Sequence, residues 1–117
     1  MAAKTKARIY HNPRCTKSRE TLALLREHGV EPEIVEYLKT PPDEAELRGL
    51  VKKLGGARAL VRTKEAAYAA LGLGPDSSDD QIVQAILREP VLLERPVVVV
   101  GARAAIGRPP EQVLALL

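Results

Sequence analysis

The spacing of apolar residues predicts a strand, a helix and a second strand in the first third of the chain. Residues 8–11 form a short β-prone run that Asn12-Pro13 interrupts. From residue 17 to residue 28 apolar residues recur at helical spacing, and Gly29 supplies a left-handed stop. Residues 33–38 partly alternate between polar and apolar, as a half-buried strand does. Because crossovers between parallel strands are right-handed, we expect these two strands to lie parallel in one sheet.

The middle of the chain predicts helices and no strands. Thr40 offers an N-cap, two prolines that a first helical turn tolerates follow it, and Asp43 adds a carboxylate. The helix that begins there has one apolar face, made of Leu47, Leu50, Val51 and Leu54. Short helical pieces are expected over residues 57–71. A capping-box pattern at residues 77–81 then starts a further helix that ends at Pro90.

The end of the chain predicts a hairpin and a last helix. Residues 97–100 are consecutive valines, Gly101-Ala102 turns the chain, and residues 103–106 can return as the partner strand. Pro109-Pro110 then opens a helix. The whole pattern predicts an α/β protein of the thioredoxin-like fold, with a four-stranded mixed sheet and a helical insertion at about residues 41–90, between the second and third strands. With 117 residues, a single domain is expected.

Composition and charge exclude several classes of protein. Apolar residues make up 45% and charged residues 28% of the chain, so a disordered protein is not indicated. No apolar run approaches the ~20 residues of a membrane span, and no signal peptide begins the chain, so we expect a cytoplasmic protein without membrane contact. One cysteine cannot form an internal disulfide, and one cysteine with two histidines does not match the common zinc patterns. The net charge of +3 comes from dispersed Lys and Arg, which favours small anions over nucleic acid.

The single cysteine, Cys15, has the setting of a reactive thiol. It lies between the first predicted strand and the first predicted helix, with Arg14, Lys17 and Arg19 around it. Unpaired amide N–H groups at a helix N-terminus and nearby positive charge stabilise a thiolate, so we expect the pKa of Cys15 to be lowered. A lone cysteine is otherwise an inert apolar residue of the core, but a loop position among cations is the wrong setting for one.

Three polar residues near Cys15 complete this part of the candidate site. His11 and Asn12 end the first strand and can hydrogen-bond toward the sulfur. Ser18 stands where a C-x-x-C motif places its second thiol. Because Ser18 offers only a hydroxyl, an adduct on Cys15 must be resolved by an external thiol such as glutathione.

Three arginines lie at the ends of predicted elements, where loops carry binding groups. Arg62 lies between two helical pieces, Arg95 precedes Pro96 and the valine run, and Arg108 follows the hairpin. The strand after Pro96 is expected beside the first strand, which places Arg95 against Cys15, and the Arg95-Pro96 bond is a candidate for the cis form. Guanidinium groups bind oxyanions in a bidentate fork, so these arginines predict an oxyanion site around a thiolate.

Five stretches of the sequence resemble a known family. They are IYHNPRCTKSRETLALL, YLKTPP, ALVRTKE, ERPVVVV and IGRPPE, in order from Ile9 onward. Together they resemble the glutaredoxin-linked arsenate reductase family, whose fold is thioredoxin-like with a helical insertion. Thr16-Lys17 follows the cysteine where characterised members usually have Gly and then Ser or Thr, so the chain is closer to a sister group of arsenate-reductase-like proteins.

The resemblance implies a reaction and a set of roles. Cys15 is then the nucleophile that attacks arsenate, Arg62, Arg95 and Arg108 bind and stabilise the oxyanion, and His11 helps to activate the thiol. Asn12 and Ser18 join His11 as candidate substrate-binding residues. Glutathione is the co-substrate, glutaredoxin regenerates the enzyme, and no bound cofactor or metal is needed.

Other functions of the same fold stay open at this point. One is a general glutathione-dependent thiol oxidoreductase that acts on disulfides. Another is a thiol-sensing regulator that binds RNA polymerase, although such proteins typically have C-x-x-C where this chain has Ser18. A folded protein without activity is the third. Since no apolar helix face is left over, we expect a monomer.

Overall fold

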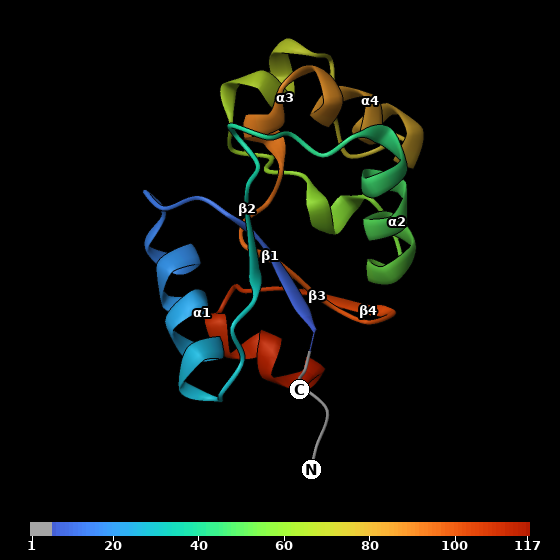
Figure 1. Cartoon of the computed structure of the whole chain (residues 1–117). Helices are drawn as coiled ribbons and strands as arrows, with labels where there is room; N and C mark the ends of the chain where they lie inside the picture. Colours follow the sequence, from blue (N-terminus) through green and yellow to red (C-terminus); the bar gives the residue numbers. More distant parts are fainter. Residues whose placement is uncertain (1–5) are drawn as a thin grey trace. The chain divides into compact units, whose positions relative to one another are not determined.

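The computed structural model describes residues 6–117, and its central feature is a four-stranded sheet. The strands are β1 (Ala7–His11), β2 (Glu33–Glu36), β3 (Val97–Val100) and β4 (Arg103–Ile106), in the order β2-β1-β3-β4. β1 pairs parallel with β2 and antiparallel with β3, and β3 pairs antiparallel with β4 (Figure 1). The predicted thioredoxin-like mixed sheet is therefore confirmed. β2 ends at Glu36 rather than at residue 38, because the chain enters a turn at residue 37.

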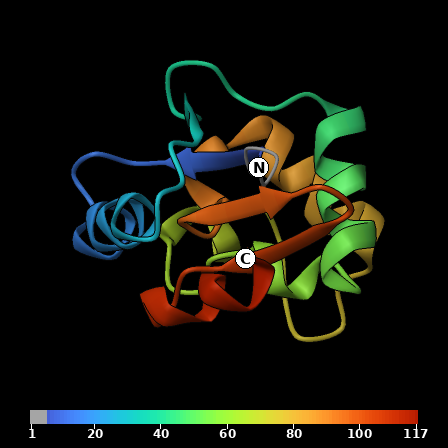
Figure 2. The ribbon, with the colours of Figure 1, turned by 60° about the horizontal axis from the view of Figure 1, so that its bottom comes forward.

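One face of the sheet packs against two helices. They are α1 (Thr16–Glu27) and the C-terminal 3-10 helix η3 (Pro110–Leu116), which contact each other. Figure 2 shows η3 beside the hairpin of β3 and β4. Full burial of an aliphatic side chain contributes roughly 1.5–3 kcal/mol, so the burial of this core stabilises the packing of the two helices on the sheet. Its fully or nearly fully buried members are Ile9, Leu25, Val30, Val98, Val113 and Leu116.

Residues 38–94 form a second compact unit, here called the helical unit, and residues 6–37 and 95–117 form the sheet unit. The helical unit contains α2 (Glu44–Leu54), η1 (Arg58–Leu60), α3 (Ala66–Ala70), α4 (Asp79–Arg88) and η2 (Pro90–Leu92). α2 packs against α4, and apolar side chains of α2, η1, α4 and η2 are buried. Within residues 6–117, no helix is both long and apolar enough to cross a bilayer.

The two main helices of the helical unit begin at capping boxes. At α4 the prediction is confirmed: the Gln81 N–H donates to Ser78 Oγ at 3.1 Å, and the Ser78 N–H donates to Gln81 Oε1 at 2.7 Å. At α2 the predicted cap, Thr40, is wrong, and Asp43 is the N-cap, whose Oδ1 accepts from the Glu46 N–H at 2.8 Å. Pro41 itself precedes a proline and therefore avoids the helical region, so the helix starts only after both prolines.

Candidate functional site

Cys15 is the N-cap of α1. Its backbone is extended, its N–H donates to the Asn12 carbonyl at 3.0 Å, and its carbonyl accepts from the Arg19 N–H at 3.0 Å. The chain thus turns tightly between β1 and α1 and leaves the thiol at the positive end of the helix. The thiol is free and partly exposed. The prediction that the first helix begins beside this cysteine is confirmed.

Two arginines, one before β3 and one after β4, meet at Cys15. Arg108 Nη2 lies 3.5 Å from Cys15 Sγ, and Arg108 Nε donates to the Arg95 carbonyl at 2.7 Å. The Arg95 side chain also interacts with Cys15. Both arginines precede cis-prolines: the cis bond of Arg95-Pro96 was predicted, whereas that of Arg108-Pro109 was not. The structure therefore brings together three of the four residues that the sequence nominated as catalytic.

A crowded glycine keeps the two arginine segments adjacent. The Gly107 N–H donates to the Pro96 carbonyl at 2.9 Å. A Cβ at Gly107 would overlap Thr21 Oγ1 and lie 2.7 Å from Pro96 Cγ. Only a residue without a side chain allows this approach between α1 and the segment that carries Arg108.

The surroundings of Cys15 lower the pKa of its thiol. Burial alone raises that pKa, because it disfavours the charged form. The Ser18 backbone N–H, which points at the sulfur, and the Arg95 and Arg108 guanidinium groups outweigh burial and bring the pKa below its ordinary value. This is the direction that the sequence predicted, and it favours the nucleophilic thiolate.

The sequence neighbours of Cys15 have other partners. Arg19 donates to the Pro13 carbonyl at 2.9 Å and to Thr16 Oγ1 at 3.2 Å. Lys17 forms an ion pair with Glu20 at 3.6 Å. The cations that act on the sulfur are thus Arg95 and Arg108, which are distant in sequence, rather than the neighbours from which the low pKa was predicted.

His11 and Ser18 form a buried pair below the thiol. Their Nδ1 and Oγ atoms lie 2.6 Å apart, and the Ser18 oxygen also accepts from the Asn12 N–H at 3.0 Å. Burial lowers the pKa of His11, with Arg19 and Arg26 adding to the effect and Glu36 opposing it, so the ring is neutral. The Asn12 carboxamide accepts from the Arg14 N–H at 3.0 Å. The hydrogen bonds of these polar groups support the Cys15 loop, and their contact with substrate stays a prediction.

Arg62 lies in the helical unit, where two carboxylates bind it. Its Nε is 3.1 Å from Glu65 Oε1 and its Nη1 is 2.9 Å from Glu94 Oε1. Its backbone N–H donates to the Leu92 carbonyl at 2.8 Å. The predicted role of Arg62 toward an oxyanion therefore stays a prediction from the resemblance.

Tyr37 is a residue of this region that sequence analysis missed. It is completely buried, and its side chain interacts with Arg95. In the sequence it reads as an ordinary aromatic residue at the end of a strand. The available signal was its place just beyond a parallel strand, at the edge where the Cys15 loop also begins.

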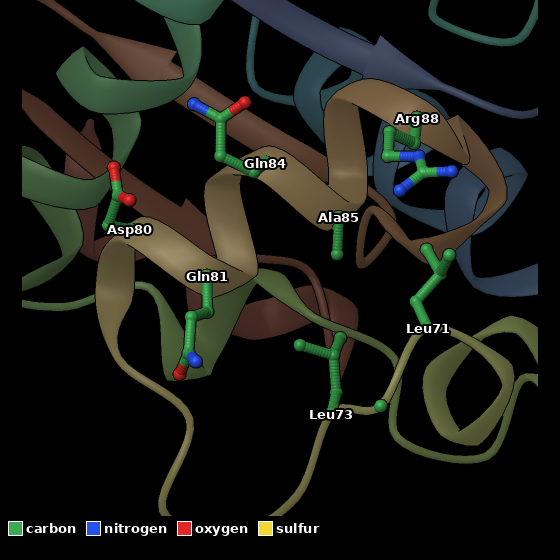
Figure 3. Close-up of a pocket in the computed structure, with 8 residues that line it drawn as sticks. Leu71, Leu73, Asp80, Gln81, Gln84, Ala85 and Arg88 are labelled. Atoms are coloured by element: carbon green, nitrogen blue, oxygen red, sulfur yellow. The ribbon is translucent and has the colours of Figure 1, made fainter.

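Cys15 lines neither of two hollows in the structure, although His11 of the thiol site lines one of them. In the helical unit a hollow of about 250 Å³ lies beside α4, with Leu71, Leu73, Ala85 and polar side chains around it (Figure 3). Its acid, Asp80, already pairs with Arg48. In the sheet unit a groove of about 690 Å³ runs along α1 from Pro13 to Glu27. Within residues 6–117, no group of three or more His, Cys, Asp or Glu side chains could bind a metal ion.

Comparisons with known proteins agree on one family. The model of the ArsC family matches residues 10–116. The chain is similar to an arsenate reductase of Neisseria meningitidis serogroup A, at 48% identity over 94% of this chain and 97% of the other. It is also similar to uncharacterized protein YfgD of Escherichia coli K12, at 57% identity over 94% and 95% of the two chains. A solved structure of an arsenate reductase from Vibrio cholerae superposes with a TM-score of 0.92 at 47% identity, covering 98% of this chain and 100% of that one.

Proposed function

Because the chain belongs to the ArsC family, we propose that it reduces arsenate to arsenite with Cys15 as the nucleophile. The observation that carries the proposal is a thiol of lowered pKa at the N-terminus of α1, with Arg108 3.5 Å from the sulfur and Arg95 beside it. The helix end and the guanidinium groups favour the thiolate, and the same cations offset the charge of a tetrahedral oxyanion. The relatives that are named arsenate reductases support arsenate as that oxyanion.

In the first step the Cys15 thiolate attacks arsenic. A sulfur–arsenic bond forms, an arsenic–oxygen bond breaks, and the oxygen leaves as water with protons from solvent. Arg95 and Arg108 stabilise the negative charge on the remaining oxygens, and such preorganised charge is usually the largest catalytic contribution. The Ser18 backbone N–H acts on the sulfur itself, and the neutral His11 ring fixes the Ser18 hydroxyl behind it.

The two electrons come from external thiols. Glutathione replaces a second oxygen on arsenic, which leaves as water, so that arsenic is bonded to the sulfur atoms of Cys15 and glutathione. A glutaredoxin thiolate then attacks the glutathione sulfur. A disulfide forms between them, and the electron pair of the arsenic–glutathione bond stays on arsenic, which becomes trivalent. Water finally hydrolyses the arsenic–Cys15 bond and releases arsenite and the free thiol.

The need for an external reductant follows from Ser18. In a C-x-x-C protein the second thiol would displace the adduct within the chain. Here the side chain at this position carries a hydroxyl instead of a thiol. It is also fully buried and hydrogen-bonded to His11, so an adduct on Cys15 cannot be displaced from this position. This observation supports glutathione and glutaredoxin as partners.

The decisive experiment is arsenate-dependent NADPH oxidation with glutathione, glutathione reductase and glutaredoxin. We expect turnover by the wild type and a loss of about 10³-fold or more in Cys15→Ser, since Cys15 is the only cysteine of the chain and a hydroxyl is a much weaker nucleophile than a thiolate. Urea unfolding of both proteins shows that the substitution leaves the fold intact. A folded wild type that does not turn over arsenate contradicts the proposal.

The same variants separate this function from disulfide reduction. A glutathione-dependent oxidoreductase needs the Cys15 thiolate but has no oxyanion to bind. Its activity on a small disulfide should therefore survive Arg108→Ala, whereas arsenate reduction should not. Equal losses in both assays would show that Arg108 acts through the thiol alone.

A further inference from the structure

The register of the sheet brings Tyr37 and Arg95 to one edge. Tyr10 of β1 pairs with Val35 of β2 and with Val97 of β3. Tyr37 comes two residues after Val35, and β2 runs parallel to β1. Arg95 comes two residues before Val97, and β3 runs antiparallel to β1. Both side chains therefore start at the level where β1 ends and the chain continues toward the Cys15 loop.

The Arg95 side chain is fixed at this edge from two directions. Its Nε atom is buried, although the residue as a whole is only partly buried. Burial lowers the pKa of Arg95, but interactions with Cys15 and with Tyr37 outweigh burial and raise it. Tyr37 is itself completely buried, so its ring cannot move away without opening the core. The Arg95 side chain thus interacts both with the reactive sulfur and with a phenol whose ring is fixed by packing.

We propose that Tyr37 is a positioning residue, whose buried phenol oxygen orients the Arg95 guanidinium toward Cys15 and the oxyanion. An arginine side chain loses rotamer freedom when it is fixed, and a side chain that is mobile beforehand loses this freedom during the reaction. A phenol oxygen on a rigid ring fixes the Arg95 side chain when the protein folds, so the rotamer entropy is already lost before substrate binds. The inference rests on the proposed function only for its effect on arsenate, because its effect on the Cys15 thiol requires no substrate.

The competing explanation is that Tyr37 merely fills the core. Tyr37→Phe distinguishes the two, because it keeps the buried ring and removes only the oxygen. The chain also offers a matched control, Tyr10→Phe: Tyr10 is equally buried, and its side chain interacts with Arg8, near the opposite end of β1. Both variants delete one phenol oxygen beside an arginine, but only Tyr37 faces the arginine at Cys15.

The experiment measures the rate of Cys15 alkylation by iodoacetamide against pH. We expect the midpoint of this profile to rise by about 0.5–1 pH unit in Tyr37→Phe, and to stay at the wild-type value in Tyr10→Phe. In Arg95→Ala, the further change Tyr37→Phe should have no effect on the midpoint, since the group it orients is gone. In the arsenate assay, Tyr37→Phe should raise KM about tenfold with a smaller change in kcat.

The outcomes keep the two proposals apart. An unmoved midpoint in a folded Tyr37→Phe overturns the positioning role even if arsenate is reduced. A midpoint that also moves in the Arg95→Ala background overturns it as well, because the phenol would then act on the thiol by another route. A raised midpoint that depends on Arg95, in a protein that does not turn over arsenate, leaves the inference standing and removes the proposed function.

Discussion

The two units of this protein use arginine in different ways. In the helical unit, Arg62 donates to the carboxylates of Glu65 and Glu94, so its charge is compensated by acids of the same unit. In the sheet unit, Arg108 donates to a backbone carbonyl and to the Cys15 sulfur. A carbonyl fixes a guanidinium in place without cancelling its charge. An arginine that can bind an anion is therefore recognised by its hydrogen-bond partners. A carbonyl partner leaves its charge available, whereas carboxylate partners compensate it.

The largest effect expected from removing an arginine tests the sheet unit directly. Arg108→Ala should lower kcat/KM for arsenate by about 10²–10³-fold, since it removes a cation aimed at the reacting sulfur and oxyanion. Arg88→Ala, at the exposed end of α4, removes the same charge from the helical unit and should leave kcat/KM within about twofold. Equal losses from both variants would mean that net charge, rather than placement, attracts the substrate.

A glycine pair tests how tightly each unit packs. Gly107→Ala should lower the free energy of unfolding by about 2–3 kcal/mol, because the new Cβ overlaps Thr21 and Pro96. Gly74→Ala in the helical unit meets no atom within 4 Å and should change stability by less than about 0.5 kcal/mol. Urea unfolding measures both values. A stable Gly107→Ala with normal Cys15 alkylation would show that the Arg108 segment adapts easily.

Arg62→Ala tests whether an arginine whose charge is compensated by carboxylates still contributes to activity. Arg62→Ala leaves two half-buried carboxylates without this partner and should cost about 1–2 kcal/mol of stability. The resemblance further predicts a fall in kcat/KM of at least about tenfold, measured well below the melting temperature. The control is Arg48→Ala, which also removes two ion pairs from the helical unit. If Arg62→Ala loses stability alone, its role is confined to the fold.

The smallest effect is the pH dependence of stability that Cys15 contributes. Folding lowers the pKa of this thiol, so around the ordinary thiol pKa the folded state binds fewer protons than the unfolded state. The contribution is fully present above the ordinary pKa and is lost as pH falls through the lowered value. The wild type should therefore gain stability relative to Cys15→Ser as pH rises through this window. A difference that stays flat in urea unfolding across the window would be evidence against a lowered pKa.

Local patterns were enough to predict most of the elements. The valine run and its glycine turn predicted β3 and β4 with the bounds that the structure has, because the β-propensity of valine and a turn residue act within a few positions. The Ser78 cap was predicted for the same reason. The Thr40 cap was wrong because Pro42 keeps Pro41 out of the helical region, so Pro41 cannot be the first helical residue after Thr40.

That a lone thiol begins a helix, and that arginines lie at the ends of distant elements, could be inferred from the order of residues alone. Which cations reach the sulfur depends on the tertiary fold. Side chains next to Cys15 in sequence radiate from the helix and find local partners such as Pro13 and Glu20. The antiparallel pairing of β3 with its neighbours places Arg95 and Arg108 near Cys15. The parallel pairing of β2 with β1 places Tyr37 at the same edge of the sheet. Strand register is set by the burial of a whole face of the sheet, so no local pattern contains it.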